Sequence, residues 1–586
     1  MLEGELIMTT KMTWEKLLSE QRPNPSENSK FDIDNPFEED YYTIINSSYF
    51  RRLKDKTQIF TMDNNDSIRN RLTHSLEVSS IGEIIGIKLS KKLLNSEYKD
   101  EVVGCDIEKN LPMILRCAGL LHDIGNPPFG HQGEEYIRSF FRNNFKREDK
   151  ADSKEDKVDS NIFYKIKDEQ LRADLENFEG NAQGLRIATK LGKSFFDGHK
   201  SHYGLNLTCA VLSCIIKYPI SSLEKHKQQE DERKAGKKED EIKYGKIGFY
   251  FTEQRIVNKV IAKNVGTFDT ENNKILKNPI MFLLEAADDI AYATADFEDG
   301  VRKDKIDKYR LNNKELNAEI EKLNSPENEN ELEYSMDLTE VVQAHMQKIR
   351  KDAIDKVVDK FFDNYEKIMT GEYEDELVPD DIKNLKNICE TFYHDRDLKN
   401  NAILDSEKRI HGILKYLIEV LRTDKLTLSQ FVIKMELKQY IDKVKSVDKY
   451  ELEWDNDKKK IDWKEKQAYC DYLVVTDFVS GMTDGYVEKF WNKLYDIERK
   501  EAREYISLLP ERIEKVNSKY KARKMYEELR ILSQVLCEDD DYDRENTSSN
   551  DIISNYSKNQ ILIKISTNEH IKAKLSKRKK TNWSLK

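Results

Sequence analysis

The residues best suited to chemistry in this sequence are a neighbouring histidine and aspartate, His122 and Asp123. They follow an apolar stretch, CAGLL, whose spacing predicts a helix, and Gly125, Pro127 and Pro128 break that helix directly after them. Adjacent side chains on a helix diverge by about 100°, so both can reach one metal ion only where the ion approaches the backbone edge. A helix end allows that approach, and the pair therefore predicts part of a metal site.

A metal ion needs more than two ligands, and two other segments offer them. His74 lies on a predicted helix in NRLTHSLEV, and EAADDIAYATADFEDG carries Asp288, Asp289, Asp296 and Asp299 among small apolar residues. Acidic groups in an apolar helix need partners because burying an unpaired charge is costly. Imidazole and carboxylate ligands together suit divalent ions, Mg or Mn in the first place and Co or Fe as alternatives.

A second candidate pair, His131 and Glu134, follows the Pro-Pro turn. A separation of three residues places both side chains on one face of a helix, where they can share a hydrogen bond. A carboxylate that orients an imidazole makes it a proton donor or acceptor near neutral pH. Single His-Asp dipeptides and helix-surface His-Glu pairs are also common in proteins without such roles, so from the residues alone both interpretations stay open.

The elements that must position these residues are predicted to be helices. Apolar residues at helical spacing recur along the chain, and Gly (22) and Pro (11) are few, so the fold class is mainly α. Four highly charged stretches are predicted to be solvated insertions or loops: 146–160, 224–243, 316–333 and 538–551. Two β-like stretches, 246–251 and 561–565, predict minor hairpins or edge strands.

Composition narrows the class of protein. The formal net charge of -11 does not favour nucleic-acid binding by the molecule as a whole, although the basic segment 572–586 could contact phosphate. The seven cysteines are scattered without a CxxC pair, which argues against disulfides and thiolate zinc sites and fits a cytoplasmic location. No apolar run reaches the roughly 20 residues that span a bilayer, so no membrane association is expected.

The order H...HD...D along predicted helices resembles the HD superfamily of metal-dependent phosphohydrolases. Within it, seven segments resemble the deoxyguanosine triphosphate triphosphohydrolase (dGTPase) family, in that family's order: RRLKDKTQIF (51–60), IRNRLTHSLEVSSIG (68–82), LLHDIGNPPFGHQGEE (120–135), NFEGNAQGLRI (177–187), LNLTCAVLSCIIKYP (205–219), EAADDIAYATADFEDG (285–300) and DFVSGMTDGYVEKFW (477–491). The resemblance runs from about Trp14 to Trp491, and it is weak over 315–470 and in the last hundred residues.

The resemblance implies a role for each matching position. Four side chains would bind the metal, with Asp289 beside them and not a ligand: His74, His122, Asp123 and Asp288. His131 and Glu134 would form the catalytic dyad. Six residues would bind the substrate: Gln58, Arg71, Lys217, Tyr218, Tyr292 and Asp296. In this scheme Arg71 and Lys217 meet the phosphates, Tyr292 packs on the deoxyribose and Asp296 accepts its 3′-hydroxyl, while Glu179 and Asn181 line the pocket.

The function that the resemblance implies is hydrolysis of a deoxynucleoside triphosphate, dGTP first, to deoxynucleoside and tripolyphosphate, which would control deoxynucleotide pools. A water molecule activated by the metal or held by His131 would attack the α-phosphorus. The resemblance further implies a homo-oligomer, with a hexamer as the first choice, and binding of single-stranded DNA. The alternatives are another HD phosphohydrolase, such as a nucleotidase or a cyclic-nucleotide phosphodiesterase, and a nucleotide-sensing HD protein that binds nucleic acid.

The expected organisation has four parts. They are an N-terminal segment (1–30), an HD catalytic core (31–310) with charged insertions near 146–160 and 224–243, a helical C-terminal part of the dGTPase-like domain (311–500), and a helical extension with a basic tail (501–586).

Overall fold

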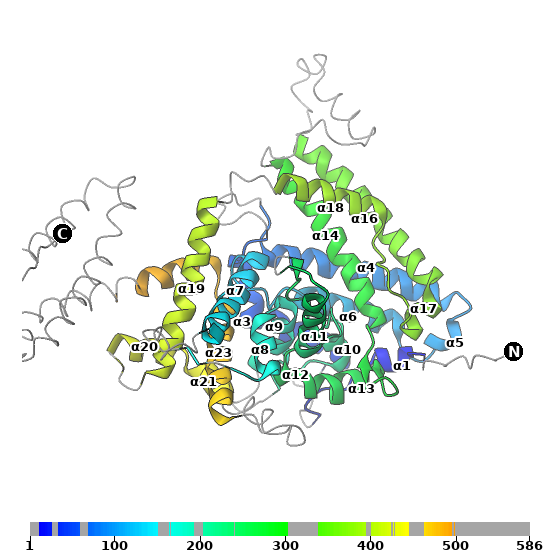
Figure 1. The fold of residues 1–586 in the computed structure, drawn as a ribbon. Coiled ribbons are helices and arrows are strands. Elements are labelled where there is room, and N and C mark those ends of the chain that lie inside the picture. Colours follow the sequence, from blue (N-terminus) through cyan, green and yellow to red (C-terminus); the bar gives the residue numbers. More distant parts are fainter. Residues whose placement is uncertain are drawn as a thin grey trace, which may run out of the picture. The chain divides into compact units, whose positions relative to one another are not determined.

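A computed structural model of the chain describes residues 11–25, 33–58, 68–150, 163–164, 166–192, 203–238, 241–302, 338–393, 400–423, 426, 428–444, 462–494 and 497. The predicted mainly α fold is confirmed (Figure 1). Within the described ranges the only sheet is an antiparallel pair, β1 (Phe268–Asp269) and β2 (Lys274–Ile275). The chain divides into two compact units, residues 1–488 and 489–586. In the second unit, residues 489–494 are helical.

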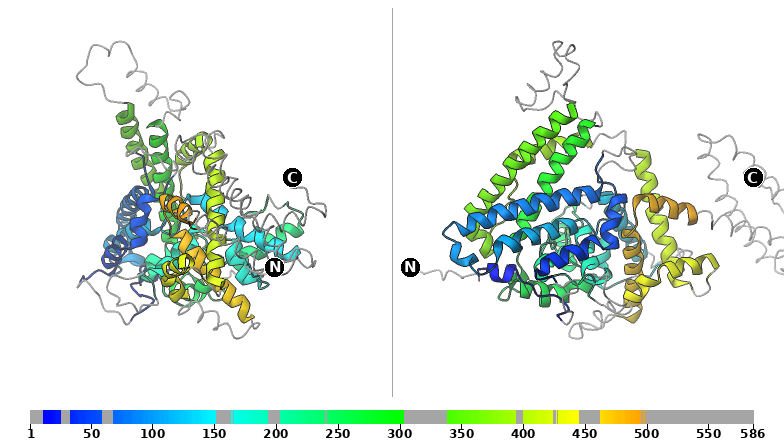
Figure 2. Two further views of the ribbon diagram at one scale, coloured as in Figure 1. Left: turned by 90° about the vertical axis from the view of Figure 1, so that its left-hand side faces the viewer. Right: turned by 180° about the vertical axis from the view of Figure 1, so that it is seen from behind.

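Three long helices form the centre of the first unit. α4 (Arg71–Leu94) packs along α6 (Ile107–Leu121), and α14 (Pro279–Arg302) packs on both. α2 (Pro36–Ile45) covers α6, while α16 (Leu338–Asp363) and α18 (Asp380–Tyr393) cover α14. Figure 2 shows the blue α4 and α6 running alongside each other in the view from behind. The helices are joined in one hydrophobic core, so the three segments that carry the candidate ligands are held against each other.

Further helices surround this centre. α7 (Gly130–Lys150) packs on α8 (Glu169–Glu176) and α19 (Asn400–Arg422), and α19 packs on α23 (Trp463–Ser480). The other helices are α1 (Trp14–Leu17), α3 (Ser48–Arg52), α5 (Lys99–Val102), α9 (Gly180–Arg186), α10 (Cys209–Ser213), α11 (Ser222–Lys234), α12 (Phe251–Ile256), α13 (Ala262–Asn264), α17 (Tyr365–Thr370), α20 (Leu428–Glu436) and α21 (Lys438–Lys443). A 3-10 turn (Leu53–Asp55) and two π-helical segments (Ile187–Leu191, Val257–Ile261) also occur among the described residues.

Local sequence explains how α4 begins and how α4 and α6 meet. Asn70 and Thr73 form a capping box that starts α4. Glycines then allow the two helices to approach closely, because a Cβ atom at Gly86 would lie 2.8 Å from Cα of Pro112 and one at Gly119 would lie 2.6 Å from Cα of Ser79.

Two expectations about the surface segments were wrong. Residues 246–251 form no hairpin: Phe249 makes an isolated bridge to Ser221, and the chain turns at Gly245 and Lys246, which have positive φ angles. The charged stretch 224–243 is not simply a solvated loop, since residues 224–234 belong to α11. One face of α11 is buried, and its Gln229 hydrogen-bonds Asn177 at 2.7 Å.

Other expectations fall wholly or partly outside the described residues. The backbone of 146–150 is helical within α7. Residues 151–160, 316–333, 538–551, 561–565 and 572–586 lie outside the described ranges. In the part of the chain that the structure describes, no helix combines the length and the apolar character needed to cross a membrane.

Candidate active site

The four candidate metal ligands come from three helices and meet at one point. His74 lies on the first turn of α4, His122 and Asp123 directly follow α6, and Asp288 lies in α14. One potential ligand atom from each of His74, His122 and Asp123 lies within 4.8 Å of the others. Asp288 Oδ1 is 3.1 Å from His74 Nε2 and 3.6 Å from His122 Nε2. The structure therefore places two imidazoles and two carboxylates together.

The donor atoms of this group fit a divalent cation. Nδ1 of His122 donates to the carbonyl of Gly119 at 2.7 Å, so the lone pair is left on Nε2. That buried Nε2 has no hydrogen-bond partner among the described residues, yet it lies 3.6 Å from an oxygen of Asp123 and from one of Asp288. In the neutral imidazole this lone pair and the two carboxylates repel each other, and a cation between them, either a proton or a metal ion, removes that repulsion.

The electrostatics of the group also favour a cation. Burial opposes ionisation of both aspartates, but Arg71 and the two histidines lower the pKa of Asp123 to about 2, and His122, His74 and Lys217 hold the pKa of Asp288 far below its usual range. Burial alone would lower the pKa of His74, but its hydrogen bond to Asp288 raises it. The aspartates are therefore anionic near neutral pH and attract positive charge to this point.

The candidate dyad lies on the first turns of α7. His131 Nδ1 is 3.0 Å from Glu134 Oε2, and the other oxygen of Glu134 accepts the backbone N–H of Gly180 at 2.8 Å. The His131 side chain is 79% exposed, whereas that of Glu134 is 4% exposed. The hydrogen bond to Glu134 raises the pKa of His131. Burial opposes ionisation of Glu134, but that hydrogen bond lowers its pKa. The solvent-accessible imidazole of His131 can therefore bind a proton and release it.

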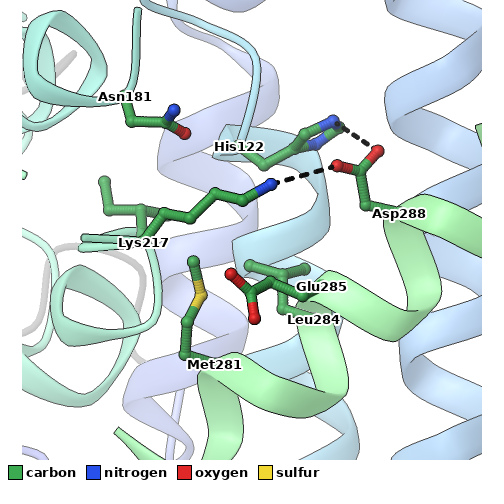
Figure 3. Close-up of a pocket in the computed structure, with 8 residues that line it drawn as sticks. His122, Asn181, Lys217, Met281, Leu284, Glu285 and Asp288 are labelled. Carbon is green, nitrogen blue, oxygen red and sulfur yellow. Dashed lines mark ion pairs between the residues drawn. The ribbon is translucent and has the colours of Figure 1, made fainter. Parts of the chain in front are cut away.

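Two cations adjoin the ligand group. Arg71 Nη1 donates to Asp123 Oδ2 at 2.6 Å, and its Nε has no hydrogen-bond partner among the described residues. Lys217 Nζ lies 3.9 Å from Asp288 Oδ2, and Figure 3 shows its side chain reaching across the pocket toward that carboxylate. Both can meet an anionic ligand beside the metal-binding group.

A pocket beside the ligand group is lined by His122, Asn181, Ile215, Lys217, Met281, Leu284, Glu285 and Asp288 (Figure 3). It therefore contains three of the predicted site residues and also Asn181, which was expected to line it. Glu179 is not in this lining; it is buried, and it accepts hydrogen bonds from the Asn181 side chain and the backbone of Lys246.

The remaining predicted substrate residues lie outside this lining. Tyr292 and Asp296 continue along α14 beyond Asp288 and hydrogen-bond each other. Gln58 has a buried side-chain oxygen without a hydrogen-bond partner among the described residues. The Lys246 ammonium lies 5.2 Å from the centroid of the Tyr218 ring.

Sequence reasoning missed several residues at the site. Met281, Leu284 and Glu285 share one face of α14 with Asp288, at spacings of seven, four and three residues, so helical periodicity could have found them. Lys386 of α18 pairs with Asp289 at 2.7 Å and lies over the Tyr292 ring. It belongs to the segment where the family resemblance is weak, and no local pattern singled it out.

Comparison with known proteins identifies the family. The HD domain family matches residues 71–176, which include His74, His122 and Asp123. A deoxyguanosinetriphosphate triphosphohydrolase-like protein of Listeria monocytogenes is 32% identical, and the match covers 82% of this chain and 99% of that relative. A protein of the same description from Synechocystis is 32% identical over 63% of this chain and 76% of its own length. A deoxyguanosinetriphosphate triphosphohydrolase of Yersinia pestis is 33% identical over 49% of this chain and 54% of its own. The chain therefore belongs to the family of deoxyguanosinetriphosphate triphosphohydrolase-like proteins with an HD domain.

Proposed function

We propose that this protein hydrolyses a deoxynucleoside triphosphate, dGTP first, to deoxynucleoside and tripolyphosphate, with a divalent metal ion held by His74, His122, Asp123 and Asp288. The observation that carries the proposal is the convergence of these four side chains beside Lys217 and Arg71. The name of the Yersinia relative supports the choice of substrate. Mg or Mn is the expected ion, because imidazole and carboxylate donors accept both.

The proposed chemistry divides the work among these groups. A bound divalent ion would neutralise phosphate charge and make a water molecule more acidic. Lys217 and Arg71 would bind the phosphates and hold the α-phosphorus in place. Water then adds to the α-phosphorus, the bond from phosphorus to the 5′-oxygen breaks, and that oxygen takes up a proton. His131, oriented by Glu134, would move the proton at its exposed imidazole nitrogen.

The proposal extends to substrate selection. Tyr292 would pack on the deoxyribose and exclude a 2′-hydroxyl, Asp296 would accept the 3′-hydroxyl, and Gln58 and Tyr218 would make further contacts with the nucleoside. The hydrogen bond between Tyr292 and Asp296 supports this assignment because it orients the phenol ring. We also propose a cytoplasmic homo-oligomer, with a hexamer as the first form to test, that binds single-stranded DNA.

Product analysis tests the function. Wild type and His122→Ala are incubated with each of the four deoxynucleoside triphosphates and with GTP, in Mg and in Mn, and the products are separated by ion exchange. We expect deoxynucleoside and tripolyphosphate from wild type alone, with dGTP consumed fastest and GTP left intact. Release of diphosphate or single phosphate would contradict cleavage at the α-phosphorus. No turnover in either metal would overturn the proposed substrate class.

A further inference from the structure

A short series of contacts joins the candidate metal ligands to the His131–Glu134 dyad. It runs through two residues to which the family resemblance assigned no role, Asn126 in the turn after α6 and Gly180 at the start of α9.

On the metal side, Asn126 holds one oxygen of Asp123. Its side-chain amide donates to Asp123 Oδ1, the oxygen that lies 3.6 Å from His122 Nε2. Arg71 binds the other oxygen of the same carboxylate, so the two contacts together set its rotation. Asn126 is itself fixed, because it is 7% exposed and its backbone carbonyl accepts the ammonium group of Lys56.

On the dyad side, Gly180 holds one oxygen of Glu134. Its backbone N–H donates to Glu134 Oε1 at 2.8 Å, while Glu134 Oε2 is left for His131. An N–H to a buried carboxylate is a charge-assisted contact, and it fixes which oxygen faces the imidazole.

The two sides meet at the α-carbon of Gly180. A Cβ atom at this position would lie 2.2 Å from Asn126 Oδ1 and 2.7 Å from Glu134 Oε1. Both side chains therefore occupy space that any residue larger than glycine would need. The backbones are equally close, because a Cβ atom at Gly125 would lie 2.0 Å from the carbonyl oxygen of Gly180. Neither Asn126 nor Glu134 can shift toward α9 without displacing this contact.

We infer that Asn126 and Gly180 are positioning residues that hold the metal-binding carboxylate of Asp123 and the proton-transferring dyad in one fixed relation. This inference rests on the roles proposed above for Asp123, His131 and Glu134. It predicts that one added methyl group at residue 180 disturbs both the metal group and the dyad, although residue 180 belongs to neither.

The test compares Gly180→Ala with Gly184→Ala, four residues further along α9. A Cβ atom at Gly184 would meet its nearest neighbour at 3.5 Å, an ordinary contact, so the same substitution on the same helix has no clash.

Two quantities are measured: Mn affinity by titration calorimetry, and the pKa of His131 in Mg by NMR of histidine-labelled protein, with its signal assigned through His131→Gln. Gly180→Ala should weaken Mn binding about 10-fold, as loss of an outer contact to a ligand does, and lower the pKa of His131. Gly184→Ala should match wild type in both.

Wild-type values in both measurements for Gly180→Ala, or equal effects of the two substitutions, would overturn the inference. If Gly180→Ala does not fold, Asn126→Ala decides, because it removes the side-chain donor to Asp123 and adds no bulk. About 10-fold weaker Mn binding is expected for it, and unchanged binding would overturn the inference. Neither measurement needs turnover. A coupled response without any triphosphate hydrolysis would therefore refute the proposed function alone.

Discussion

At the scale of single residues, the hydrogen bond of His122 Nδ1 decides which ring nitrogen can bind a metal. Because its Nδ1 donates to the Gly119 carbonyl, its Nε2 is presented as a lone pair toward two carboxylates. An imidazole held in this tautomer is a preorganised metal ligand, and the same group without a cation keeps a buried nitrogen unsatisfied.

His122→Ala should therefore weaken Mn binding by more than about 100-fold, beyond the 10- to 100-fold typical of losing an outer contact. Calorimetric titration of the purified protein measures this directly. His226→Ala is the matched control, since His226 is also a histidine with little exposure but lies on α11. Equal Mn affinity in wild type and His122→Ala would remove His122 from the ligand set.

The His131–Glu134 pair predicts a pH effect. The carboxylate raises the pKa of His131, so the imidazolium persists to higher pH than in an isolated histidine. Glu134→Gln removes the negative charge, and the pKa of His131 should fall toward its ordinary value of about 6.5. The limb of the kcat–pH profile that reports His131 should move to lower pH, whether His131 acts as acid or base.

The control is Glu135→Gln, the next residue, whose half-exposed carboxylate pairs with Arg138 and Arg142; Arg138 keeps its contact of 3.7 Å with Glu134 in this variant. It should keep the wild-type profile. A kcat–pH profile that is the same in Glu134→Gln as in wild type would show that the protonation of His131 does not determine this limb of the profile.

At the scale of elements, the site depends on how closely α4 and α6 approach, since His74 lies on one helix and His122 directly follows the other. Gly119 sets that distance where it faces Ser79, one turn before His122. Gly119→Ala should force the helices apart and cost about 1–3 kcal/mol of unfolding free energy, as added bulk in a packed core does. Mn affinity should fall as well, because His122 moves with α6.

Denaturant unfolding and calorimetry measure the two effects. Gly485→Ala, where an added Cβ meets nothing within 4 Å, is the control and should change neither. Lower stability with unchanged Mn affinity would show that the ligand geometry does not depend on the spacing of these helices.

At the scale of the whole molecule, a buried ion network ties together segments distant in sequence. Arg186 at the end of α9 is fully buried; it makes two 2.8 Å contacts to Asp477 of α23 and one at 3.0 Å to Glu253 of α12. α9, whose Gly180 N–H binds Glu134, is thus anchored at its other end through Arg186 to α23, which lies nearly 300 residues later in the sequence.

Arg186→Met should cost about 3–5 kcal/mol of unfolding free energy, because the buried Asp477 loses the guanidinium group while Glu253 keeps its ion pair with Lys190. Lys234→Met, which removes an exposed pair with Asp231, should cost about 0–1 kcal/mol. Urea unfolding of both variants at neutral pH provides the comparison. Similar midpoints for the two would show that the Arg186 network adds no net stability.

Features that depend on neighbours in the chain were predictable from local sequence. Helical spacing predicted the mainly α fold, the glycine and prolines after Asp123 predicted the end of α6, and a three-residue separation predicted the His131–Glu134 contact. These features depend on a few consecutive residues, so chain periodicity and turn chemistry are sufficient to define them.

The way in which these parts meet depends on the packing of the helices. Asp288 and Asp289 are neighbours of identical type, and their separation into one acid facing the histidines and one facing Lys386 depends on the rotation of α14 against α4 and α18. The burial of one face of α11 and the meeting of Asn126, Gly180 and Glu134 are likewise products of packing. Such contacts join residues from 46 to 214 positions apart, and no local pattern encodes them because the helices in between set their geometry.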